Sequence, residues 1–207
     1  FYIKKIQKIA SKFEKYIKDI SYFIAKLDLT YSNAKTAILN NYNRPIIVDS
    51  DNSNIKAKKL RHPLVEKINK EIPYVPNDVE LGTKNSLGMI LMGVNASGKT
   101  VFAKAIGIAI VMAQAGMFVP AKSMEYTPFK NILTRILGND NILKSLSSFA
   151  VEMTELKSIL TRANKNSLIL GDEICRGTEQ ESGTALVAAS IIKLQQSNAP
   201  FIYTTHL

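Results

Sequence analysis

The feature that most constrains the fold is the stretch at 93–100, which reads Gly-Val-Asn-Ala-Ser-Gly-Lys-Thr. It follows an apolar run at 89–92 and opens a segment, 99–115, whose apolar residues recur at helical spacing. A glycine, four variable residues and Gly-Lys-Thr between a strand and a helix is the spacing of a phosphate-binding loop. The stretch therefore predicts a strand–loop–helix unit, as found in α/β folds.

Each residue of this loop has a separate expected task. Gly93 and Gly98 permit backbone angles that turn successive N–H groups toward phosphate oxygens, helped by the helix N-terminus. The Lys99 ammonium would reach the β- and γ-phosphates, and the Thr100 hydroxyl would face Mg²⁺. We therefore expect ATP and Mg²⁺ as ligands. The alternative is a glycine-rich turn that binds no nucleotide.

Strand and helix patterns alternate along the rest of the chain. Strands are expected at 117–120, 131–136, 167–172 and 201–205, and helices at 149–164 and 179–197. Strands that alternate with helices predict a mainly parallel sheet covered by helices on both faces.

The N-terminal residues, up to about 42, are expected to be helical, as one long helix or two joined near Asp28. Apolar residues recur there every three or four positions between lysines: Ile6, Ile9, Phe13, Ile17, Ile20, Ile24 and Leu27. A helix of about 40 residues would be ~60 Å long, which exceeds one compact domain. We therefore expect a helical lever at 1–44 and a nucleotide-binding domain at 45–207.

Positive charge is concentrated near the N-terminus. Residues 1–70 hold 15 Lys and Arg against 6 Asp and Glu, whereas 71–207 hold 12 against 11. One interpretation is that this positive segment faces nucleic acid. The other is that it is a solvated helix face, because its lysines are scattered and lack stacking aromatic residues between them. Both interpretations stay open. The apolar runs are too short to span a membrane. The absence of a leader pattern and the single cysteine, Cys175, predict an intracellular protein without an internal disulfide.

Polar residues follow two further apolar runs. Asp172 and Glu173 come at the end of the run at 167–171, where ligands of open α/β sheets bind. Asp172 would hold the water shell of the metal, and Glu173 would orient or deprotonate the attacking water, which favours hydrolysis. His206 follows the run at 201–205 and would hydrogen-bond a γ-phosphate. A helix cap or a surface or packing role is the alternative for each.

Taken in order, these motifs resemble the ATPase domain of the MutS family of DNA mismatch-repair proteins, within the ABC-type ATPases. The loop keeps Asn95, as in the family string Gly-Pro-Asn-Met-Gly-Gly-Lys-Ser, and residues 172–178 match the family's Asp-Glu-x-x-Arg-Gly-Thr. Similar segments lie at 60–66, 115–121, 132–136, 147–153 and 204–206, the last reading Thr-Thr-His where the family has Ala-Thr-His. Val94 in place of the loop proline, and Ala96-Ser97 in place of Met-Gly, indicate a divergent branch.

The resemblance implies a P-loop, ABC-ATPase-like fold and assigns a role to each matched position. The phosphates and Mg²⁺ would be bound by seven loop residues: Gly93, Asn95, Ala96, Ser97, Gly98, Lys99 and Thr100. Asn77 would lie near the adenine. Asp172 and Thr100 would serve the metal, Glu173 the attacking water, and His206 would sense the γ-phosphate. Ser147 would contact the ATP of the opposite subunit, so complete sites would form only in a homo- or heterodimer.

The implied function is ATP binding and hydrolysis coupled to recognition of mismatched double-stranded DNA by domains outside this chain. The chain alone is expected to hydrolyse ATP weakly or not at all. Two alternatives stay open: another DNA-associated or transport ABC-type ATPase, and a MutS-like branch that controls recombination by nucleotide-dependent dimerisation. A Leu-Ser-Gly-Gly-Gln signature would favour the first, and the sequence lacks one. Intact Lys99, Asp172 and Glu173 argue against a non-catalytic branch.

Overall fold

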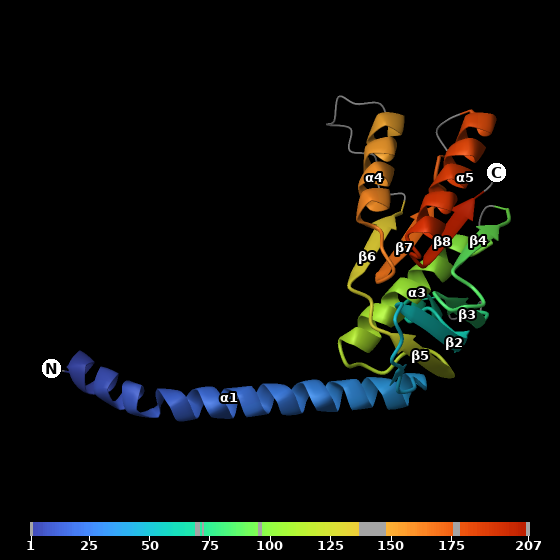
Figure 1. Ribbon diagram of the computed structural model, residues 1–207. Helices are drawn as coiled ribbons and strands as arrows, with labels where there is room; N and C mark the ends of the chain where they lie inside the picture. Colours follow the sequence, from blue (N-terminus) through green and yellow to red (C-terminus); the bar gives the residue numbers. More distant parts are fainter. Residues whose placement is uncertain are drawn as a thin grey trace. The chain divides into compact units, whose positions relative to one another are not determined.

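The computed structural model describes residues 2–68, 71, 73–94, 97–136, 148–175 and 179–205. They form two compact units, residues 1–42 and 43–207. The first unit consists of α1 (Tyr2–Asn40), a single α-helix that continues through Asp28 without a break (Figure 1). The second unit is an α/β structure with two four-stranded sheets.

The helix α1 is amphipathic, and its apolar stripe is exposed in this chain. The seven stripe residues from Ile6 to Leu27 are between 48% and 62% exposed. The helix therefore follows from the spacing of these residues and from the lack of Gly and Pro, and burial of the stripe does not stabilise it here. Among the described helices, none combines the length and the apolar character that crossing a membrane requires.

One sheet of the second unit is entirely parallel. Its strands lie in the order β4 (Gly88–Met92), β8 (Phe201–Thr205), β7 (Ser167–Asp172) and β6 (Asn131–Arg135), as Figure 1 shows. The two central strands, β7 and β8, are buried along their whole length. This explains why both are continuous apolar runs, since a strand covered on both faces has no solvent-facing side.

Helices cover both faces of this sheet, as the alternating pattern predicts. On one face, α3 (Lys99–Gln114) packs against Leu168, Leu170 and Ile202. On the other, α4 (Ser148–Arg162) and α5 (Gln180–Gln196) share a core with residues such as Ile169 and Tyr203.

The second sheet is mixed and was not predicted from the sequence. Its strands lie in the order β1 (Ile46–Ile47), β5 (Ser123–Thr127), β2 (Asn54–Leu60) and β3 (Asn77–Leu81). The strand β2 is antiparallel to both of its neighbours, while β1 and β5 are parallel. The expectation of one mainly parallel sheet was therefore right for half of the strands only.

The prediction of a strand at 117–120 is wrong. Only Val119 pairs there, in an isolated bridge in which its N–H and C=O bond to the backbone of Asn43 at 2.9 and 3.0 Å. The next N–H group that could continue this antiparallel pairing, that of Ala121, donates instead to the Val119 carbonyl oxygen at 2.8 Å, so the pairing stops after one residue.

The helix α3 lies between the two sheets, and it joins their cores. Small residues on α3, including Ala105 and Ala109, are fully buried in one cluster with Ile55 and Tyr126 of the mixed sheet. A Cβ at Gly107 would lie 2.8 Å from Cδ1 of Leu170, so glycine permits the close approach of helix and sheet.

His62 is a buried residue that supports the chain between β2 and the short helix α2 (Val65–Ile68). Its Nδ1 accepts hydrogen bonds from the backbone N–H groups of Leu64 and Val65, both at 3.3 Å. Burial lowers the pKa of His62 below its ordinary 6.5, and the Lys104 ammonium adds to the effect. The native structure therefore holds the neutral imidazole.

This arrangement predicts how stability depends on pH. The unfolded chain takes up a proton on His62 near the ordinary pKa of 6.5, while the native chain does so only at lower pH. Between about pH 7.5 and about pH 5.5, we therefore expect wild type to lose free energy of unfolding relative to His62→Gln, which cannot titrate. Urea unfolding of both proteins at the two pH values measures this difference, and an unchanged difference would contradict the assignment.

Candidate functional site

The carboxyl ends of the parallel strands meet at one edge of the sheet. Met92 of β4 is in register with Thr205 of β8, and Thr204 is in register with Asp172 of β7. The phosphate-loop sequence begins directly after Met92, so it starts at the same edge as Asp172. This juxtaposition follows from the parallel pairing, because parallel strands present their carboxyl ends together.

The helix α3 begins directly after Gly98, which belongs to the described part of the loop. Gly98 is the N-cap residue, with φ of 92°, a backbone conformation in the left-handed region that glycine adopts without strain. Among the described residues, no side chain caps this end of α3. The first N–H groups of the helix are thus available to an anion, which the helix dipole favours. Asn95 and Ala96 of the loop lie outside the described residues.

The Lys99 side chain turns back onto its own loop. Its Nζ donates to the carbonyl oxygens of Gly93, at 2.7 Å, and Val94, at 2.9 Å. These bonds hold the ammonium beside the loop and satisfy two of its three donor positions. An anion bound in the loop would exchange these neutral acceptors for charged oxygens, which form stronger hydrogen bonds with an ammonium.

Thr100 and Asp172 are in direct contact, although 71 residues separate them in the sequence. The Thr100 Oγ1 donates to both carboxylate oxygens of Asp172, at 2.8 and 2.9 Å. Asp172 is only 4% exposed. The structure therefore brings the first turn of α3 and the end of β7 to one point.

The oxygens gathered at this point fit Mg²⁺. A hydroxyl and a carboxylate are hard ligands, and Mg²⁺ commonly takes one or two such protein groups together with water and substrate phosphates. In the described part of the chain, no cluster of three or more His, Cys, Asp or Glu forms an alternative metal site. The oxygens of Thr100 and Asp172 fit this ion.

The turn after β7 has an unusual backbone. Glu173 and Cys175 have φ of 50° and 62°, in the left-handed region, which costs a non-glycine residue about 1–3 kcal/mol. Two hydrogen bonds from other elements hold this turn. The Glu173 N–H donates to the Thr204 Oγ1 at 3.0 Å, and the Cys175 N–H donates to the Glu152 Oε1 at 2.7 Å. The conformation of Glu173 therefore depends on β8 and α4.

Sequence reasoning missed Thr204 and Glu152. Both are buried, at 1% and 7% exposure, and both belong to segments already noted for their family resemblance, 204–206 and 147–153. A single acidic residue on the buried face of a helix was the available signal for Glu152. Cys175 is a packing residue, as its 1% exposure shows. Burial raises the pKa of its thiol to about 11, so the thiol stays protonated at neutral pH.

The other predicted site residues are not brought to this edge by any described contact. Asn77 begins β3 on the mixed sheet, where its amide donates to the Val75 carbonyl at 2.8 Å. Ser147 and His206 lie outside the described residues, as do 176–178. The adenine, γ-phosphate and cross-subunit roles given to Asn77, His206 and Ser147 stay predictions.

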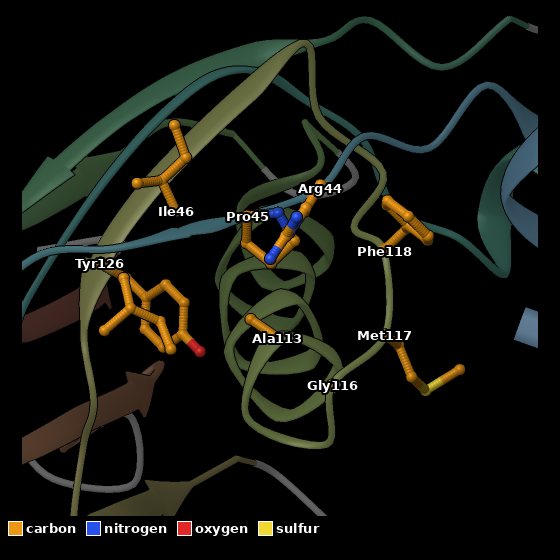
Figure 2. A pocket seen from close by; sticks show the side chains of 9 residues that line it. Arg44, Pro45, Ile46, Ala113, Gly116, Met117, Phe118 and Tyr126 are labelled. Carbon is orange, nitrogen blue, oxygen red and sulfur yellow. The ribbon is translucent and has the colours of Figure 1, made fainter. Parts of the chain in front are cut away.

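A cavity of about 620 Å³ lies elsewhere in the second unit. Figure 2 shows Arg44, Pro45 and Tyr126 around it, together with Ala113 and Gly116 at the C-terminal end of α3. Lys99 and Thr100 are at the opposite end of this 16-residue helix, which is about 24 Å long at the standard rise per residue. The cavity is therefore separate from the phosphate loop.

Comparison with known proteins agrees with the motifs. The family model described as MutS domain V matches residues 89–207. The chain is 38% identical over 242 residues to a putative DNA mismatch repair protein, a mutS homologue, of Acanthamoeba polyphaga mimivirus, and the match covers 100% of this chain and 22% of that protein. It is 39% identical over 210 residues to the mitochondrial DNA mismatch repair protein mutS homologue of Sarcophyton glaucum, covering 100% and 21%.

A bacterial relative extends this range. The DNA mismatch repair protein MutS of Petrotoga mobilis is 38% identical over 206 residues, covering 99% of this chain and 23% of that protein. The chain thus spans between 21% and 23% of the length of these three relatives. The family model covers more than half of the chain and includes the loop, Asp172 and Glu173. The chain therefore belongs to the MutS family.

Proposed function

We propose that this chain is the ATP-binding and ATP-hydrolysing part of a MutS-like DNA mismatch-repair protein, with Mg²⁺ as cofactor. The observation that carries the proposal is the hydrogen-bonded pair of Thr100 and Asp172, at 2.8 and 2.9 Å. This pair joins the residue after the loop lysine to the acid at the strand end. A phosphate-binding ATPase needs those two groups at one point.

Nucleotide binding rests on the start of α3. The N–H groups after Gly98, which no described side chain caps, would bind phosphate oxygens. The Lys99 ammonium would leave its loop carbonyls for the β- and γ-phosphates. Mg²⁺, when bound, supplies positive charge beside these phosphates. Thr100 and Asp172 hold its ligand shell through their oxygens.

Hydrolysis rests on Glu173. Its carboxylate follows Asp172 by one residue, beyond the end of β7, on a backbone that Thr204 holds in place. A carboxylate next to the phosphate site can orient a water molecule and accept its proton. The neighbouring residues thereby divide the work, with Asp172 assigned to the metal and Glu173 to the water.

The role of the whole protein is proposed from its relatives. Three of them are named as DNA mismatch repair proteins, and this chain spans about a fifth of their length. We propose that domains outside the chain bind mismatched double-stranded DNA and that α1 is the lever that joins them to the ATPase. We further propose that two subunits share their ATP sites, with Ser147 reaching the opposite nucleotide. Loss of the γ-phosphate would then release the interface.

The first test concerns nucleotide binding. Lys99→Ala removes the ammonium from the loop, and we expect it to weaken ATP binding by about 10- to 100-fold, the value of a hydrogen bond to a charged group. Equilibrium titration with a fluorescent ATP analogue measures the affinity. Lys104→Ala, which removes an exposed lysine from the same helix, is the matched control and should bind as wild type does. Equal affinity of Lys99→Ala and wild type would reject the loop as the nucleotide site.

The second test separates binding from hydrolysis. Glu173→Gln keeps the size of the side chain and removes its ability to accept a proton. In the assembled protein we expect unchanged ATP affinity and a hydrolysis rate lower by about 10²- to 10⁴-fold, the usual contribution of a general base. Single-turnover release of phosphate measures the rate. Retained turnover in Glu173→Gln would reject the assignment of the water to this residue.

A further inference from the structure

Thr204 makes hydrogen bonds with two consecutive residues at the end of β7, Asp172 and Glu173. Its Oγ1 donates to the Asp172 Oδ1 at 2.6 Å and accepts from the Glu173 N–H at 3.0 Å. The same N–H also approaches the Thr204 carbonyl oxygen at 3.1 Å. One hydroxyl thus links the carboxylate of one residue to the backbone of the next.

The sheet itself does not require a hydroxyl at this position. Thr204 is 1% exposed in the central strand β8, and the preceding residues Phe201, Ile202 and Tyr203 are buried hydrophobic side chains. Valine has the same shape, suits a buried strand and avoids the cost of burying a polar group. The threonine hydroxyl is therefore explained by its partners, Asp172 and Glu173.

Among the described residues, two hydroxyl groups donate to Asp172, those of Thr100 and Thr204. Bound Mg²⁺ would affect these two hydroxyl groups differently. Thr100 donates to both carboxylate oxygens, but its hydroxyl is also the group that would turn to Mg²⁺. Thr204 lies on the in-register neighbouring strand, and its hydroxyl belongs to no expected ligand contact. If the Thr100 hydroxyl turned to the ion, the Thr204 hydroxyl would still donate to Asp172 and would limit the rotation of its carboxylate.

We propose that Thr204 is a positioning residue that holds Asp172 oriented toward Mg²⁺ and, through the Glu173 N–H, holds the turn that carries Glu173. This inference rests on the proposed ATPase function and adds a residue to it. Groups that orient metal ligands typically contribute 10- to 100-fold to metal affinity or activity. The family motif that 204–206 resembles has alanine at the position of Thr204. We therefore expect removal of the hydroxyl to lower Mg²⁺ affinity and activity by a factor at the lower end of that range.

The test compares Thr204→Val, which removes the hydroxyl and keeps the shape, with Thr204→Ser, which keeps the hydroxyl. Binding of a non-hydrolysable fluorescent ATP analogue is titrated with Mg²⁺ and repeated in a chelator. We expect Thr204→Val to need about tenfold more Mg²⁺ for half-maximal binding and to bind as wild type does without Mg²⁺. In the assembled protein we expect its kcat to be about tenfold lower at saturating Mg²⁺. Thr204→Ser should show the wild-type Mg²⁺ midpoint and the wild-type kcat.

Ser190→Ala is the matched control for loss of a buried hydroxyl, because Ser190 is 2% exposed and donates to the Val187 carbonyl within its own helix. It should leave the Mg²⁺ midpoint unchanged. Circular dichroism establishes that each variant is folded. A folded Thr204→Val with the wild-type Mg²⁺ midpoint, or a Thr204→Ser with the same loss as Thr204→Val, would overturn the inference and leave the proposed function intact. Failure of wild type to bind any nucleotide would reject the proposed function and the inference together.

Discussion

The burial of α3 between two sheets is the constraint on which the rest of the second unit depends. Its alanines and Gly107 allow the helix to approach both sheets closely, and the core of each sheet is completed by the same helix. A helix that is closely packed on two sides has little freedom to shift or rotate. Its first turn, which carries Lys99 and Thr100, is therefore held at the strand end that carries Asp172.

The candidate site is a second consequence of this packing. Parallel pairing places the end of β7 beside the end of β8, and α3 adds Thr100 from the face of the sheet. The buried Asp172 carboxylate then accepts hydrogen bonds from two hydroxyl groups of the described residues, those of Thr100 and Thr204, as a buried polar group requires. The neighbouring turn accepts left-handed backbone at Glu173 because Thr204 provides a fixed acceptor. Asp172, Thr100, Thr204 and the Glu173 backbone thus support one another from different elements, whereas Lys99 is held by the carbonyl oxygens of its own loop.

Much of the parallel half of the fold was predictable, because its signals are local. The segments 167–172 and 201–205, which are β7 and β8, each contain three consecutive apolar residues, at 168–170 and 201–203, as is typical of strands buried on both faces. The mixed sheet was not predicted because β2 alternates buried Ile55 and Ala57 with lysines over only seven residues. That pattern is short, and it becomes a central strand only when β3 and β5, from distant parts of the chain, pair with it.

The sequence alone determined which chemical groups this protein carries and in what order: a glycine-rich loop, a lysine, a threonine and an acidic pair after an apolar run. It also determined the family, because those motifs occur in a fixed order. Only the tertiary structure decided which groups meet. The contacts of Thr100 and Thr204 with Asp172, and of Glu152 with the turn after β7, join residues between 23 and 72 positions apart. Such contacts depend on strand register and helix packing, which no local pattern in the sequence specifies.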